Sequence, residues 1–153
     1  MPTTYDRLVA AYGDPHQQPA FAARNLTTYS LPTDVAKVWP PFAGHPITRI
    51  TVNKAVIPPL LKVFAELVAT GLVRELKTYD GGYNYRPQRG STRLSMHSFG
   101  VALDFNAATN GLGKPVTFSA AFLGVWRRNG WTCGADWKMP RTDGMHFQYT
   151  ILP

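Results

Sequence analysis

The sequence predicts a single α+β domain with a small, mainly antiparallel sheet flanked by helices. A length of 153 residues suits one domain that buries its own core. Apolar residues make up 44% of the chain and charged residues 16%, which is typical of a globular protein rather than a disordered one. Candidate strands and helices are both present, and neither an internal repeat nor a convincing linker separates them.

The first 45 residues contain one plausible helix, Thr4 to Tyr12, which Thr3 or Thr4 can cap and Gly13 can end. Six prolines follow between positions 15 and 46, and within this stretch only residues 26–31 suit a short edge strand. We therefore expect residues 1–45 to form an irregular arm that packs onto the domain.

The pattern becomes clearer from Ile47 onward. Residues 47–52 mix β-branched and polar side chains, as a strand does. Two prolines then suit the first turn of a helix that Gly71 ends, with apolar residues at helical spacing at Leu60, Leu61, Phe64, Leu67 and Val68. Residues 72–79 are predicted to form another strand, with a turn at residues 80–82.

Two later strands carry polar residues opposite their apolar faces. In residues 100–106, three apolar side chains share one face, while two very small residues and Asp104 share the other. This leaves open space around Asp104, which suits a site. A helix over residues 118–128 separates this strand from the last one, residues 145–151, in which His146 lies opposite the apolar face.

The charge balance favours an anionic partner. Sixteen Lys and Arg against nine Asp and Glu give a net charge of +7, which suits nucleic acid, a membrane surface or a bacterial wall polymer. The basic residues are scattered and no nucleic-acid recognition motif is present, so specific nucleic-acid binding is the weaker alternative. No stretch approaches the ~18–20 apolar residues of a membrane span, and we expect no membrane insertion.

Three residues suggest a metal site. The single cysteine, Cys133, cannot build a Cys-type zinc site, so a metal must use nitrogen and oxygen ligands. His97, Asp104 and His146 lie on non-core faces or in adjoining turns, and pairing of their strands would bring them together. Two imidazoles and a carboxylate suit a catalytic zinc with a fourth position for water, and Asp143 could act as its general base. Spacing alone leaves open hydrogen-bonded histidines and an aspartate paired with an arginine.

Sequence context adds a resemblance. Residues 95–104 fit S-x-H-x-x-G-x-A-x-D, and residues 143–146 fit D-x-x-H. Together they resemble the zinc D-alanyl-D-alanine carboxypeptidase family, the VanY/VanX group, and in particular its branch of phage L-alanyl-D-glutamate endopeptidases. The similarity spans residues 47–150 and leaves residues 1–45 outside it. It implies a LAS/hedgehog-type metallopeptidase fold and one catalytic domain over residues 1–153.

The resemblance also implies roles for individual residues. It makes His97, Asp104 and His146 the ligands of one zinc ion and Asp143 the catalytic base. Many relatives have Glu at the position of the base, and the shorter Asp is found in the phage branch. Arg86 occupies the position that contacts a substrate carbonyl or carboxylate, where a guanidinium can stabilise an oxyanion.

Four further residues have weaker assignments. Ser95 is expected to hydrogen-bond near the metal, with a turn-forming serine as the alternative. Asp136 either orients a ligand histidine or caps a turn, and Trp137 either lines the substrate groove or packs in the core. Cys133 is interpreted as a small buried residue without a chemical role.

The resemblance therefore implies a zinc peptidoglycan hydrolase that cuts an amide bond in the stem peptide, first of all an L-alanyl-D-glutamate endopeptidase acting as a phage lysin. A D-alanyl-D-alanine carboxypeptidase and a non-catalytic, zinc-containing wall-binding module are the alternatives. The expected partner is bacterial peptidoglycan, and we expect the protein to be a monomer. Residues 1–25 lack a basic start followed by an apolar run, so no signal peptide is expected, and we expect the chain in the host cytoplasm until its release to the wall.

Overall fold

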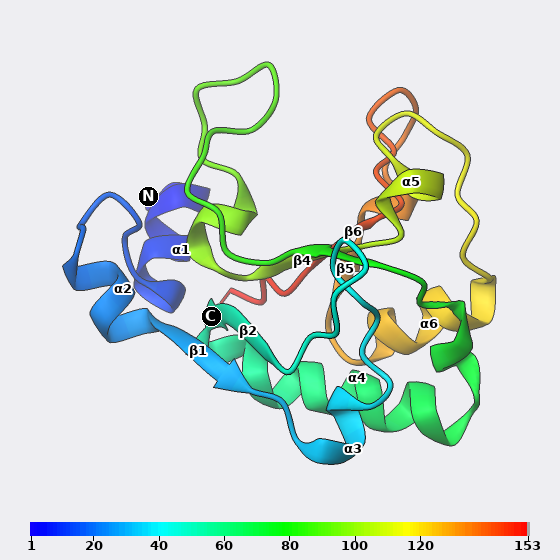
Figure 1. The fold of residues 1–153 in the computed structure, drawn as a ribbon. Coiled ribbons are helices and arrows are strands. Elements are labelled where there is room, and N and C mark those ends of the chain that lie inside the picture. Colours follow the sequence, from blue (N-terminus) through cyan, green and yellow to red (C-terminus); the bar gives the residue numbers. More distant parts are fainter. Residues whose placement is uncertain (153) are drawn as a thin grey trace.

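Two antiparallel sheets organise the computed structural model, which describes residues 1–152 (Figure 1). The first sheet pairs β1 (Leu26–Ser30) with β2 (Arg49–Asn53). The second sheet has the order β3-β4-β6-β5, with bounds Tyr79–Gly81, Ala102–Phe105, His146–Gln148 and Thr132–Cys133. The α+β prediction with small antiparallel sheets is therefore confirmed.

Six α-helices complete the described chain, and four short 3₁₀ turns join its elements. The helices are α1 (Thr4–Tyr12), α2 (Ala20–Asn25), α3 (Thr33–Ala36), α4 (Ile57–Ala69), α5 (Ala107–Asn110) and α6 (Ala120–Arg128). The 3₁₀ turns are Lys54–Val56, Leu72–Glu75, Met96–Phe99 and Gly134–Asp136. No helix within residues 1–152 is long and apolar enough to cross a membrane.

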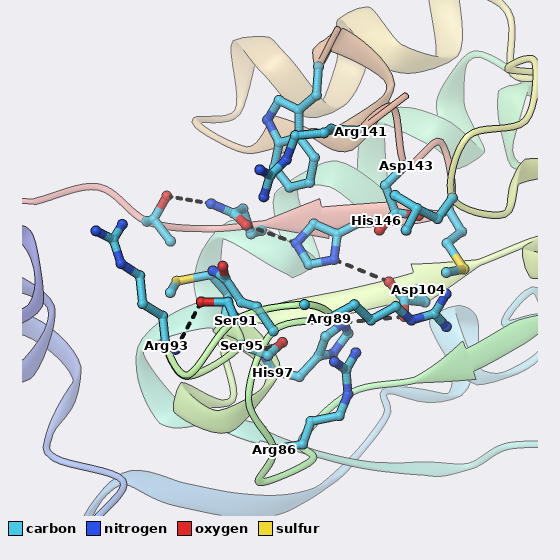
Figure 2. A pocket seen from close by; sticks show the side chains of 18 of the residues that line it. Arg86, Arg89, Ser91, Arg93, Ser95, His97, Asp104, Arg141, Asp143 and His146 are labelled. Atoms are coloured by element: carbon cyan, nitrogen blue, oxygen red, sulfur yellow. Dashed lines mark hydrogen bonds and ion pairs between the residues drawn. The ribbon is translucent and has the colours of Figure 1, made fainter. Parts of the chain in front are cut away.

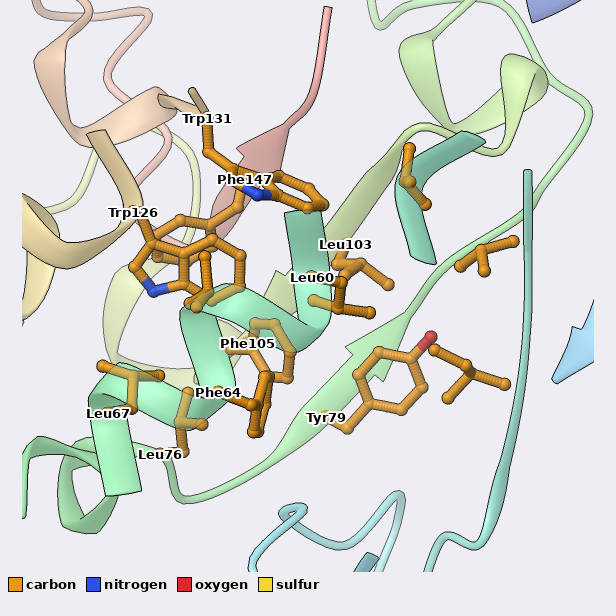
Figure 3. Packing of buried hydrophobic residues seen from close by; sticks show 14 of the residues in the cluster. Leu60, Phe64, Leu67, Leu76, Tyr79, Leu103, Phe105, Trp126, Trp131 and Phe147 are labelled. Carbon is orange, nitrogen blue, oxygen red and sulfur yellow. The ribbon is translucent and has the colours of Figure 1, made fainter. Parts of the chain in front are cut away.

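The core lies between the four-stranded sheet and helices α4 and α6 (Figure 3). Phe64 of α4 and Trp126 of α6 are fully buried, with ring centroids 6.4 Å and 5.8 Å from that of Phe105 in β4. Phe147 of β6 packs on the indole of Trp126, with ring centroids 4.3 Å apart. These rings fix one face of β4 and β6 against the helices, so the opposite face of the two strands is left for polar side chains.

Several element ends follow the predicted signals. Thr3 and Asp6 form a reciprocal capping box at the start of α1, and Gly13 ends the helix. Ser119 caps α6 through the amide of Phe122. Gly71 follows α4 in the left-handed conformation, which a glycine adopts without steric cost.

The predicted strand over residues 72–79 is wrong for most of its length. Gly71 reverses the chain into the 3₁₀ turn Leu72–Glu75, and β3 begins only at Tyr79 and takes in part of the predicted turn. The amides of Lys77 and Thr78 donate to Asn106 Oδ1, so a side chain replaces the expected ladder there.

The last strand and the N-terminal arm also differ from expectation. β6 ends at Gln148 rather than at residue 151, because the chain turns toward α1, where the Tyr12 hydroxyl donates to the Ile151 carbonyl. The arm is more regular than predicted, since β1 pairs with β2 along its whole length. Pro19 and Pro32, taken as breakers, stand directly before α2 and α3, where a missing amide hydrogen is tolerated.

Candidate active site and metal centre

The pairing of β4 with β6 brings the predicted site residues together. Asp104 and His146 are direct partners in the antiparallel ladder. His97 lies in the 3₁₀ turn that precedes β4, and its ring faces the same two side chains (Figure 2). The sequence-based expectation that strand pairing joins these three residues is confirmed.

Their potential ligand atoms form a tight group. His97 Nε2 lies 3.2 Å from Asp104 Oδ2, and His146 Nδ1 lies 3.4 Å from Asp104 Oδ1. One nitrogen or oxygen from each side chain falls within 4.8 Å of the others, and all three residues are buried. Two imidazole nitrogens and a carboxylate oxygen at these separations can hold one zinc ion and leave a position open.

A hydrogen bond to the ring nitrogen that does not face Asp104 orients each imidazole ring. His97 Nδ1 lies 2.8 Å from the carbonyl oxygen of Gly82, and His146 Nε2 lies 2.8 Å from Gln148 Oε1. A carbonyl oxygen only accepts, so each of these ring nitrogens carries the hydrogen and leaves the opposite nitrogen free to bind a metal. Sequence reasoning missed both acceptors, although strand alternation places Gln148 on the same face as His146.

Unpaired polar atoms support a metal at this position. Among residues 1–152, five buried side-chain nitrogen or oxygen atoms lack a hydrogen-bond partner, and three belong to this site: His97 Nε2, Asp104 Oδ1 and Asp143 Oδ1. A buried polar atom without a partner is costly. A cation and its water would satisfy all three atoms, so the residues present fit a zinc ion.

The pKa values of Asp104 and His146 also bear on metal binding. Burial would raise the pKa of Asp104, but the neighbouring His146 and His97 rings outweigh this effect and lower the pKa to about 2. The carboxylate is therefore ionised, as a ligand must be. Burial lowers the pKa of His146, but the adjacent Asp104 carboxylate outweighs that effect and the pKa is raised. A metal ion therefore competes with a proton for Nδ1 of His146.

Asp143 lies beside this group without being part of it. Its amide donates to the Gly134 carbonyl at 2.9 Å, and its own carbonyl accepts from the amide of His146 at 3.0 Å. A side chain at Gly134 would approach the Asp143 carbonyl oxygen to 2.2 Å, so this loop needs a glycine. Burial raises the pKa of Asp143, and a raised pKa suits a carboxylate that must take up and release a proton.

Two hollows meet at His97 and Asp104. The larger, here called the large cleft, has a volume of about 1130 Å³ and is lined by His97, Asp104, Asp143 and His146 among others. The smaller, here called the small hollow, has a volume of about 460 Å³ and shares His97 and Asp104 with it. An extended substrate can thus pass from one hollow to the other across the candidate metal position.

Comparison with known proteins adds independent support. Residues 89–149 match a family model described as D-alanyl-D-alanine carboxypeptidase. This match supports the VanY-like zinc carboxypeptidase family. It covers less than half of the chain, including His97, Asp104, Asp143 and His146, and the α+β architecture is compatible with a LAS-type fold. No curated protein matches the chain.

The residues of the site agree with the zinc peptidase family that the match supports. Members of this kind are metallopeptidases that act on peptidoglycan, and the buried His-Asp-His cluster offers the ligands that such an enzyme requires. Arg86 and the N-terminal arm lie outside the matched residues.

Arg86 is held at the site by two serines. Ser98 Oγ accepts from the Arg86 amide at 2.9 Å and donates to its carbonyl at 2.8 Å. The amide of Ser95 donates to the same carbonyl at 2.9 Å. Arg86 therefore lines both hollows from a fixed backbone. The contribution of Ser98 was not predicted.

Ser95 acts through the backbone rather than near the metal. Its hydroxyl accepts from the amide of His97 at 3.2 Å and caps the 3₁₀ turn that carries this histidine. The turn-forming alternative is therefore the one that matches the structure. The chain then enters β4 through Gly100, which has a left-handed backbone conformation. A Cβ at this position would also lie 2.7 Å from the Asn53 amide nitrogen, so a glycine is needed on both grounds.

Asp136 and Trp137 have different outcomes. Both carboxylate oxygens of Asp136 accept from Arg127, at 2.9 and 2.6 Å, so the prediction that Asp136 orients a ligand histidine is wrong. Trp137 is 36% exposed and lines the large cleft, with its ring centroid 5.3 Å from that of His146. Trp137 therefore lies at the cleft and not in the core, and its contact with substrate stays a prediction. Cys133 is buried, as expected.

The N-terminal arm also reaches the site, which the sequence did not predict. Thr4 and Leu8 of α1 line the large cleft. His16 Nδ1 lies 2.7 Å from the hydroxyl of Tyr85, next to Arg86. The arm thus forms part of the cleft wall.

Proposed function

We propose that this protein is a zinc peptidase that hydrolyses an amide bond in the stem peptide of bacterial peptidoglycan. The observation that carries the proposal is the position of Asp143, which faces the large cleft beside the His-Asp-His cluster but lies outside its ligand group. A wall-binding module with a structural metal has no use for such a carboxylate, and a hydrolase does.

The residues of the chain have complementary roles in the proposed reaction. His97, Asp104 and His146 would hold a zinc ion, which would supply Lewis acidity for activating the attacking water. Asp143 accepts the proton of the attacking water and returns it to the nitrogen of the leaving amine. Arg86 donates hydrogen bonds to the developing oxyanion.

The shape of the site favours an endopeptidase. Asp143 lines the large cleft and not the small hollow, so the leaving amine that it protonates points into the large cleft. A volume of about 1130 Å³ holds several residues, whereas a carboxypeptidase releases only one. We therefore propose cleavage between L-alanine and D-glutamate. D-alanyl-D-alanine carboxypeptidase activity is the second candidate, favoured by the description of the matched family.

The proposed biological setting rests on a single residue, Asp143. An aspartate rather than a glutamate at position 143 is the feature that favours the phage endopeptidase branch. We propose a monomeric phage lysin that meets peptidoglycan after release from the host cytoplasm.

Digestion of purified sacculi tests the proposal. The zinc-loaded protein should release peptides with a new amino terminus at D-glutamate, which mass spectrometry detects, and the Asp143→Asn variant should release almost none. Release of free D-alanine without that new terminus would favour the carboxypeptidase. No new terminus of any kind would contradict the proposal.

A further inference from the structure

Five cations line the large cleft from two facing loops. Arg86, Arg89 and Arg93 belong to the green loop in Figure 1, and Lys138 and Arg141 to the orange loop opposite it. In Figure 2 the labelled side chains of this set lie on different sides of the histidines.

None of these cations forms an ion pair with a carboxylate, although Arg89 acts on Asp143 through its charge. Within residues 1–152, none of the five forms an ion pair, since the two arginine ion pairs join Arg127 to Asp136 and Arg128 to Glu66. Of the three carboxylates that line the cleft, one contacts the two histidines and another is bound by Arg127, which leaves only Asp143. The cleft therefore has a surplus of positive charge that an anionic ligand can neutralise.

The surplus is confined to one side of the reacting centre. Arg86 and Arg89 line both hollows, whereas Arg93, Lys138 and Arg141 line only the large cleft. The small hollow instead includes Asp80. The large cleft is also the side to which Asp143 delivers its proton in the proposed reaction, so Arg93, Lys138 and Arg141 face the leaving half of the substrate.

From this asymmetry we infer that the large cleft selects stem peptides whose carboxyl groups on the leaving side are free rather than amidated, through Arg93, Lys138 and Arg141. The inference rests on the proposed function for the orientation of the peptide. Guanidinium groups bind carboxylates through paired, charge-assisted hydrogen bonds. A carboxamide is neutral and offers one acceptor, so it loses the charge and one of the bonds.

Binding to an inactive variant tests the inference directly. The ligands are two peptides, L-Ala-γ-D-Glu-L-Lys with a free α-carboxyl on the glutamate and the same peptide with that carboxyl amidated. Calorimetry with zinc-loaded Asp143→Asn should give about tenfold tighter binding of the free acid at low salt, as expected for several partly exposed ion pairs. Adding Arg93→Gln, Lys138→Gln and Arg141→Gln should reduce this preference to about twofold or less.

A matched variant controls for net charge. Lys62 is an exposed cation on α4 outside the cleft, and Lys62→Gln should leave the preference unchanged. Equal affinities for the two peptides, no measurable binding of either, or a preference that survives the triple substitution would each overturn the inference. A preference in binding without cleavage of either peptide by the wild-type protein would instead overturn the proposed function.

Discussion

The hydrogen bond from His146 to Gln148 predicts how a residue outside the metal cluster controls metal binding. Gln148 Oε1 accepts from Nε2 of His146 at 2.8 Å, and this fixes the tautomer that leaves Nδ1 free. Gln148→Leu keeps much of the side-chain volume but removes the acceptor. The buried Nε2 hydrogen then has no partner, or the proton moves to Nδ1 and blocks the metal.

The magnitude follows from the loss of one such bond. Removing a group that orients a ligand histidine weakens metal binding by about 10- to 100-fold, which equals roughly 1.4–2.7 kcal/mol. Gln148→Glu keeps an acceptor at the same place and should bind zinc at least as tightly as the wild type. Competition with a chromophoric zinc chelator measures both affinities.

Thr150→Val is the control for this series. It removes the partner of the Gln148 amide, whose nitrogen lies 3.3 Å from Thr150 Oγ1, and leaves the bond to His146 intact. We expect a change in zinc affinity of less than about threefold. If Gln148→Leu binds zinc within about twofold of the wild type, the orientation of His146 does not depend on this bond.

The remaining predictions concern the catalytic groups and the buried thiol. Asp143→Asn should retain zinc while kcat falls by about 100-fold or more; near wild-type cleavage would mean that another group is the base. Arg86→Lys should lose much of kcat/KM and Arg86→Ala should lose more, on the order of 2–4 kcal/mol, while Lys62→Ala stays unchanged in the same assay. Burial raises the pKa of Cys133 from 9.0 to about 12, so its thiol should react with a disulfide reagent at pH 8 only after unfolding. The stability gained by keeping this thiol protonated is complete below about pH 9 and is lost as the pH rises toward 12, which denaturant titrations across that range would detect.

Local signals predicted the elements that carry the candidate site. Strand alternation placed Asp104 and His146 opposite the core, and the register of β4 with β6 confirms that they are neighbours. Capping signals likewise located α1. These features depend on residues close together in the sequence, which is why composition and spacing were sufficient.

Contacts between residues far apart in the chain could not be predicted from the sequence. Asp136 bonds to Arg127 of α6 rather than to a histidine, because the adjacent helix offers a guanidinium in bidentate geometry. The Gly82 carbonyl that orients His97 is a backbone group, and no residue type marks it. Pairing of β1 with β2 likewise depends on tertiary context that the scattered prolines obscured.

The central claim is that His97, Asp104 and His146 bind one catalytic metal ion, and elemental analysis of the purified protein tests it most directly. We predict about one zinc per chain in the wild type, and a loss of zinc in both the His97→Ala and the His146→Ala variants. A full complement of zinc in both variants would contradict the assignment.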